Sequence, residues 1–155
     1  MSNDPLQYLS VLSQAESTET RTPSELVAAV CDIRPVDRVI VIGRELSEHL
    51  IALAHCGCLS ATGVTPTARH VLSEGADVVW IAGGNEIDAS VMAAVLQMTG
   101  ARLIAIELAV SATLAPVRVF LRRLRQKGLV HQSSCLAAGR LVITAQRTAR
   151  LQWAA

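Results

Sequence analysis

Two kinds of segment alternate along this chain. Short runs of Val, Ile and Leu have the length of buried strands, and the clearest is RVIVI at 38–42. Between these runs, apolar residues recur every three or four positions, which is the period of an amphipathic helix. Strands are predicted at 38–42, 59–64, 77–82, 102–108, 130–136 and 141–145, and helices at 23–31, 46–55, 67–74, 89–98 and 112–127.

Residues that typically begin and end helices stand at these boundaries. Thr22-Pro23-Ser24-Glu25 reads as a capping box with proline at the first helical position. Ser47 and Asp88 can cap the helices that follow them. Gly128 can end the last helix, and residues 137–140 can join the final two strands as a hairpin.

The order of elements is a repeated strand–helix alternation closed by two adjacent strands. It predicts an α/β domain with a mostly parallel sheet, helices on both faces and a C-terminal antiparallel hairpin. We expect one domain at 22–150, an N-terminal extension at 1–21 and a tail at 151–155. The spacing of leucines over 6–12 predicts a short helix in the extension.

Composition narrows the class of protein. Apolar residues make up 51% of the chain and charged residues 17%, which excludes a disordered protein. The high apolar share predicts that surface is covered by a second copy or another protein. The net charge of +1 supplies no field for nucleic acid, and the apolar runs are too short to span a membrane. The first residues lack a secretory signal, so we expect a cytoplasmic protein.

Four cysteines are present, and none is spaced as a CxxC pair. The run His55-Cys56-Gly57-Cys58 brings three soft ligands together. We interpret the cysteines as thiols in a reducing compartment and predict no metal site.

Parallel sheets of this kind bind ligands beyond the carboxyl ends of their strands. Four segments of the sequence are predicted to lie along that edge. They are Gly43-Arg44-Glu45, Thr65-Pro66-Thr67, Gly83-Gly84-Asn85-Glu86 and Glu107.

Residues 36–147 resemble the class I S-adenosylmethionine-dependent methyltransferases. The helix, glycine and strands at 121–145 are similar to the ending of that family, and 95–104 is similar to the helix, turn and strand that precede it. The resemblance implies a Rossmann-like fold, with S-adenosylmethionine as the cofactor. It is carried by the pattern of elements more than by invariant residues.

The cofactor motif of the family is only partly present. Alignment of its first glycine with Gly43 puts Val41 at the usual acid and places Glu45 and Ser47 at later glycines. Side chains at such positions obstruct the approach of the backbone to a cofactor. Thr65 replaces the ribose-binding acid, and the family's strand between the second strand and Asp77 is absent or reduced. The single glycine also argues against a dinucleotide dehydrogenase, which requires GxGxxG.

Several residues at the predicted edge remain candidates for ligand binding. We predict cofactor contacts from Gly43, Arg44, Glu45, Thr65, Gly83 and Gly84, and substrate contacts from Asn85 and Glu86. Arg44 and Glu45 can equally form a surface ion pair. The simpler interpretation of the loop at 83–86 is a flexible connection between a strand and a helix.

Other polar residues are assigned structural roles. Glu107 is interpreted as a carboxylate with a hydrogen-bond partner, the alternative being a base whose pKa is raised by burial. The four histidines lack metal or catalytic spacing and are treated as ordinary. The basic residues at 118–127 are interpreted as a solvated helix face, so nucleic-acid binding is not expected.

The order of elements resembles a cofactor-binding enzyme, but the cofactor motif is incomplete. Three functions are compatible with this combination. The first is a degenerate methyltransferase-like domain that binds a protein or ligand instead of catalysing a reaction. The second is an active methyltransferase in which Glu45 or Glu86 replaces the missing acids. The third is a module that binds another nucleotide or anion at the same edge.

Overall fold

The computed structural model describes residues 21–66, 75–98 and 100–147. The helices predicted within 6–12 and at 67–74 and the tail at 151–155 lie outside this part of the chain. No helix within the described ranges is long and apolar enough to cross a membrane. The described elements are α2 (Pro23–Val30), β1 (Arg38–Ile42), α3 (Ser47–His55), β2 (Ser60–Val64), β3 (Val78–Ala82), α4 (Ala89–Gln97), β4 (Leu103–Ala109), α5 (Ala115–Gln126), β5 (His131–Ala137) and β6 (Arg140–Gln146).

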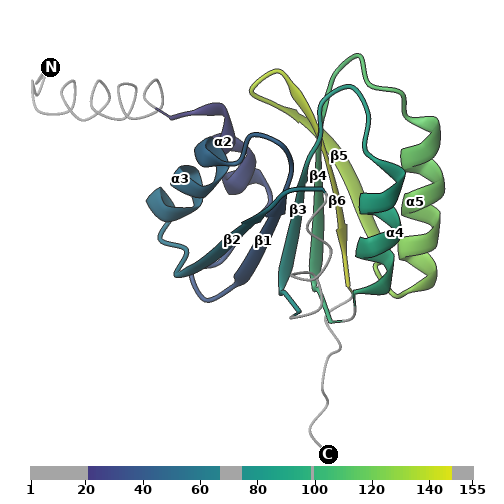
Figure 1. Ribbon diagram of the computed structural model, residues 1–155, viewed down its shortest axis with the longest axis horizontal. Helices are drawn as coiled ribbons and strands as arrows, with labels where there is room; N and C mark the ends of the chain where they lie inside the picture. The colour runs from purple at the N-terminus through teal and green to yellow at the C-terminus, as the bar shows by residue number, and fades with distance from the viewer. Residues whose placement is uncertain (1–20, 67–74, 99, 148–155) are drawn as a thin grey trace, which may run out of the picture.

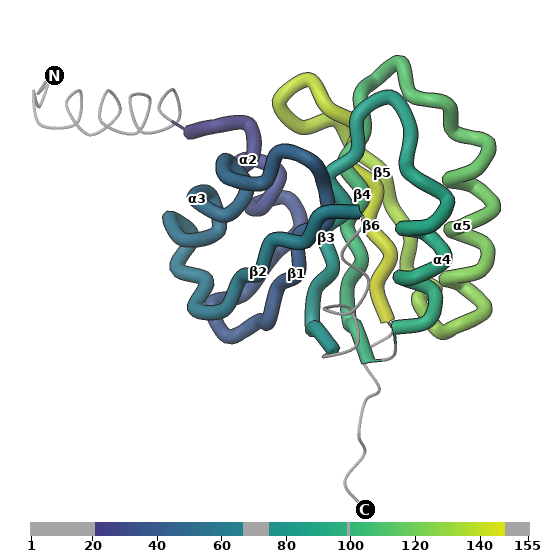
Figure 2. Tube along the Cα trace, in the orientation of Figure 1, coloured from purple at the N-terminus to yellow at the C-terminus, as the bar shows by residue number. Residues whose placement is uncertain are grey.

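The strands form one sheet in the order β2-β1-β3-β4-β6-β5 (Figure 1). The first four strands are parallel, and β6 runs antiparallel to both β4 and β5. The chain trace in Figure 2 shows β5 and β6 as the closing hairpin beside β4. The predicted α/β class, with a mostly parallel sheet and a C-terminal hairpin, is therefore confirmed.

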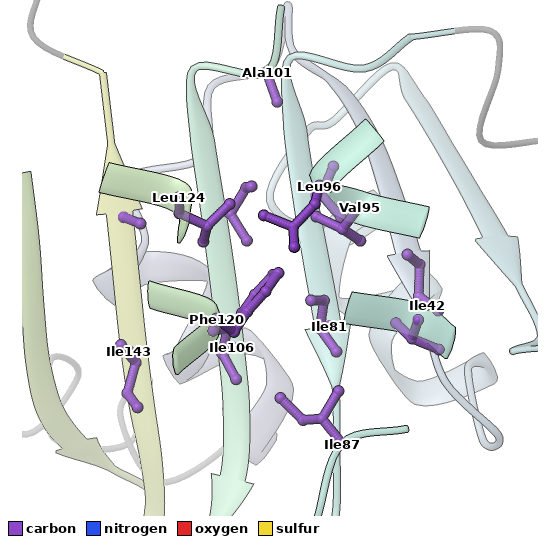
Figure 3. Packing of buried hydrophobic residues seen from close by; sticks show 14 of the residues in the cluster. Ile42, Ile81, Ile87, Val95, Leu96, Ala101, Ile106, Phe120, Leu124 and Ile143 are labelled. Carbon is purple, nitrogen blue, oxygen red and sulfur yellow. The ribbon is translucent and has the colours of Figure 1, made fainter. Parts of the chain in front are cut away.

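Apolar side chains alternate between the two faces of the sheet. Ile40 and Ile42 of β1 belong to the cluster that includes α4 and α5, whereas Val39 and Val41 belong to the cluster that includes α2 and α3. Figure 3 shows the first cluster, in which Phe120 of α5 lies close to the sheet. Burial on both faces explains why these strands are continuous apolar runs.

The helix after β1 differs from its prediction. Leu46 occupies the N-cap position without a side-chain hydrogen bond, and Ser47 is the first helical residue, so the predicted Ser47 cap is wrong. Ala54, which was expected on the apolar face, is exposed, and His49 is buried against the sheet. The prediction counted only apolar residues as buried and therefore missed His49. An imidazole can enter a core when one of its nitrogens finds a hydrogen-bond partner, as Nε2 of His49 does.

The caps of other helices agree better with the sequence. Thr22 Oγ1 accepts a hydrogen bond from the Glu25 N–H at 3.3 Å, and Asp88 Oδ1 accepts one from the Ser90 N–H at 2.8 Å. The reciprocal half of the capping box is replaced by another contact, because the Glu25 carboxylate lies 2.7 Å from His55 Nδ1. Gly128 follows α5 with φ of +98°, as a helix-ending glycine requires.

The hairpin turn is shorter than predicted. Ala137 and Arg140 are paired strand residues, so the turn consists of Ala138 and Gly139 alone. Both have positive φ, +52° and +73°. Two positive φ values in a two-residue loop suit the twist of a hairpin, but an alanine is strained there.

Ala138→Asn is expected to raise the free energy of unfolding by about 0.5 to 1 kcal/mol, because asparagine tolerates this conformation better than alanine. Urea denaturation measures the change. The matched control is Ala93→Asn, at an exposed position of α4, where asparagine is expected to cost about 0.5 kcal/mol. A loss of stability in the Ala138 variant would contradict the strain argument.

Candidate functional site

The carboxyl ends of the parallel strands lie along one edge of the sheet. Ile42 is paired with Val64 on one side and Ile81 on the other, and Ala82 is paired with Glu107. The residues that follow these strands therefore lie next to one another along that edge. They are the residues predicted for ligand binding, Gly43, Arg44, Glu45, Thr65, Gly83, Gly84, Asn85 and Glu86.

Side chains fill the corner beside Gly43. A Cβ atom on Gly43 would lie 2.9 Å from the Ala82 carbonyl oxygen and 3.2 Å from Leu46 Cδ2. One on Gly63 of β2 would lie 3.0 Å from Leu46 Cδ1. Half-buried Leu46 thus packs across the ends of β1 and β2, at the point where a backbone-hugging ligand needs room.

The residues that flank this corner face solvent. Arg44, Glu45 and Thr65 are all exposed. Within the described residues, the structure has no ion pair between Arg44 and Glu45, so the predicted surface pair is not formed.

Hydrogen bonds tie the loop after β3 to the segment after β4. The Gly83 N–H donates to the Glu107 carbonyl at 2.8 Å, and the Ala109 N–H donates to the Gly84 carbonyl at 3.0 Å. Ser111 Oγ donates to Asn85 Oδ1 at 3.3 Å. Gly84, Asn85 and Glu86 are exposed, whereas Gly83 is partly enclosed, since a Cβ on it would lie 3.1 Å from Leu108.

A polar network that the sequence did not reveal lies beneath this edge. Glu107 of β4 is only 2% exposed. Its Oε2 accepts a hydrogen bond from Trp80 Nε1 at 2.9 Å and lies 3.1 Å from His49 Nε2, and its Oε1 accepts one from Arg140 Nη1. The carboxylate thereby joins α3, β3, β4 and β6.

The charge state of the network follows from its partners. Burial by itself would raise the pKa of Glu107, but the hydrogen bonds from His49 and Arg140 outweigh burial and hold the pKa below its usual value. The expectation of a hydrogen-bonded carboxylate is therefore correct, and the alternative of a base with a raised pKa is wrong.

His49 departs from the ordinary role that the sequence predicted for it. It is 7% exposed, and its ring meets that of Trp80 edge to face at a centroid distance of 4.8 Å. An ionised Glu107 needs a donor, so Nε2 carries the proton. Nδ1 is buried and has no hydrogen-bond partner among the described residues.

Within the described part of the chain, the cysteines, His55 and His131 form no comparable site. His55 is paired with Glu25, and the buried thiol of Cys31 has a pKa raised to about 12 by burial, with a further contribution from Cys135. The described residues contain no group of three His, Cys, Asp or Glu side chains placed to hold a metal ion.

Glu107→Gln is expected to lower the free energy of unfolding at pH 7 by about 3 kcal/mol or more, because it breaks a buried ion pair. The lowered pKa of Glu107 means that its contribution is present above the unfolded-state pKa of about 4.3 and is lost as the pH falls through the folded-state pKa. The gap between wild type and variant should therefore narrow in acid.

Urea denaturation across the acid range measures this gap. Glu86→Gln, at an exposed loop position, serves as the control and should stay within about 0.5 kcal/mol of wild type. A gap that is constant with pH would refute the charge argument.

Gly43→Ala is expected to lower the free energy of unfolding by about 1 to 3 kcal/mol, since the added methyl group collides with Ala82 and Leu46. Gly84→Ala is the matched control, because a Cβ there has no heavy atom within 4 Å. It should change stability by less than about 1 kcal/mol. Thermal and urea unfolding distinguish the two, and equal effects would show that the corner is not tightly packed.

Comparisons with known proteins agree with this architecture. Neither a scan of protein-family models nor a search of curated proteins gives a match. Solved structures do match. A release-factor-specific protein-(glutamine-N5) methyltransferase from Alicyclobacillus acidocaldarius is 14% identical, with a TM-score of 0.54 over 83% of this chain and 94% of that chain.

A putative tRNA (m1A22) methyltransferase from Streptococcus pneumoniae is 11% identical, with a TM-score of 0.48 over 82% of this chain and 70% of its own. Identities this low speak only to the fold, and the Alicyclobacillus enzyme supports the comparison of folds. The chain therefore has the Rossmann-like fold of the class I S-adenosylmethionine-dependent methyltransferases.

Proposed function

We propose that this methyltransferase-like domain has lost the usual cofactor corner and acts by binding another molecule, foremost a protein, instead of transferring a methyl group. The observation that carries the proposal is the position of Leu46. Its methyl carbons lie against both Gly43 and Gly63, where a methyl donor would approach the backbone.

A ligand at this corner must first displace Leu46. Exposing a half-buried leucine side chain costs about 1 to 2 kcal/mol, which by itself weakens binding roughly tenfold. The ribose of the donor would also lack its usual acid, since Thr65 stands at the end of β2. The loss of a charge-assisted hydrogen bond costs a further 1.5 to 3 kcal/mol or so. Together these terms, about 2.5 to 5 kcal/mol, would weaken a micromolar affinity of about −8.2 kcal/mol to a Kd of roughly 0.1 mM or weaker.

The buried carboxylate of β4 is also committed to the fold. Glu107 already binds three donors of the protein, so it has little capacity left for a ligand. Glu45 and Glu86 are exposed carboxylates that the alternative of an active enzyme would have to use. No hydrogen bond or ion pair of the described residues holds either carboxylate in place, so we favour the binding domain.

Titration calorimetry with S-adenosylmethionine and with S-adenosylhomocysteine tests the proposal. We expect no binding tighter than about 100 μM, or −5.5 kcal/mol, because of the filled corner and the missing acid. A methyltransferase with an intact glycine-rich turn serves as the positive control under the same conditions. Affinity tighter than this limit would favour the active enzyme.

A further inference from the structure

Four exposed arginines lie on one helix at the outside of the molecule. Arg118, Arg122, Arg123 and Arg125 all belong to α5, which lies on the far side of the sheet from α2 and α3 (Figure 1). Within the described residues, none of the four is paired with a carboxylate. Arg125 donates only to the neutral Gln132 side chain, at 3.3 Å.

The helical residues of this layer include no acid to oppose the charge. Neither α4 nor α5 contains an aspartate or a glutamate, and α5 has no acid in its first turn. The helices of the opposite layer have the reverse pattern, since α2 and α3 hold Glu25 and Glu48 and no lysine or arginine. A net charge of +1 for the whole chain therefore conceals a cationic face.

The dipole favours Arg123 and Arg125 in the last turn of α5, but the spacing of the other arginines opposes the stability of the isolated helix. Arg118 and Arg122 are four residues apart, and Arg122 and Arg125 are three apart, so like charges face each other along the surface. Arg118 also lies near the positive end of the helix dipole. Residues that break local rules of stability in this way are expected where a surface serves another purpose.

The chemistry of this face fits an acidic helix. Arginine binds carboxylates with two parallel hydrogen bonds, a geometry that lysine lacks. Val119, which is 46% exposed, lies one turn before Arg122 and Arg123 and adds an apolar contact. We infer that the outer face of α5 binds an acidic amphipathic helix of a partner protein, with carboxylates at Arg118, Arg122 and Arg125 and an apolar residue at Val119.

A protein partner accounts for these features better than nucleic acid. Duplex-binding proteins commonly contact six to ten phosphates or so, whereas α5 offers four arginines over about 18 Å of helix. Trp80 and Phe120 are both buried, so neither offers a ring for base stacking. The inference rests on the proposed binding function and names its partner class.

Fluorescence anisotropy with a labelled synthetic peptide tests the inference. The probe is a helix of about 18 residues with glutamates spaced to match the arginines and a leucine stripe beside them. A peptide of the same composition in scrambled order is the comparison. We expect micromolar binding at low salt, weakening as salt rises, and weaker binding of the scrambled peptide.

Arg118→Glu/Arg122→Glu should weaken binding of the peptide at least tenfold. Arg21→Glu/Arg34→Glu, which changes two exposed arginines outside α5, alters the net charge equally and should change affinity less than about twofold. Circular dichroism and urea unfolding check that both variants are folded. Val119→Asp should also weaken binding without removing an arginine.

Equal losses in the two double variants would overturn the inference, as would the absence of binding to the peptide. Tighter binding of single-stranded RNA or of a DNA duplex than of the peptide would assign the face to nucleic acid instead. Self-association that Arg118→Glu/Arg122→Glu abolishes would identify a second copy as the occupant. These results are independent of calorimetry with S-adenosylmethionine, so failure here leaves the proposed loss of the cofactor corner standing.

Discussion

A buried carboxylate is stable only if the surrounding fold supplies hydrogen-bond donors to it. Glu107 is buried near the carboxyl end of the inner strand β4, and an ionised carboxylate there is tolerated only when donors replace the water that it has lost. The donors come from Trp80 on the neighbouring strand, His49 on α3 and Arg140 at the start of β6. This one group therefore fixes the position of a helix and of the closing hairpin relative to the parallel strands. It does so at the edge of the sheet where the family resemblance predicts a ligand.

The arrangement of strands and helices followed from local pattern, whereas the network did not. RVIVI at 38–42 and the glycine after α5 identify a strand and a helix end because their signals are contained in a few neighbouring residues. Trp80 and Glu107 lie in apolar strands, where a buried indole N–H and a buried carboxylate both require hydrogen-bond partners. The sequence does not say which residues those partners are. His49 belongs to an ordinary amphipathic helix, and only the packing of α3 on the sheet brings its ring to Glu107. No spacing along the chain encodes that contact.

The arginines of the described chain include two groups, those that pair with buried carboxylates and those that remain exposed on the surface. Arg140 is drawn to Glu107, and Arg102 binds the buried Asp37, whose pKa is lowered despite the effect of burial. These two arginines neutralise buried carboxylates and so stabilise the fold. The arginines of α5 serve no carboxylate of the described chain, although several acids are present on the opposite layer. The helix dipole accounts for Arg123 and Arg125 in the last turn of α5, whereas Arg118 and Arg122 have no such role in the fold and are the residues that the proposed acidic partner would contact.

Gly43 is a position at which close packing and cofactor binding would both favour glycine. A glycine at the end of the first strand suggested a nucleotide-binding turn, and the sheet around it has the expected order. Ala82 and Leu46 pack so closely against Gly43 that packing alone requires a residue without a side chain at this position. The same residue thus supports the resemblance of fold, but a glycine at this position is not by itself evidence of cofactor binding. The packing requirement acts on Gly43 whether or not a cofactor binds, so selection for stability is sufficient to preserve it.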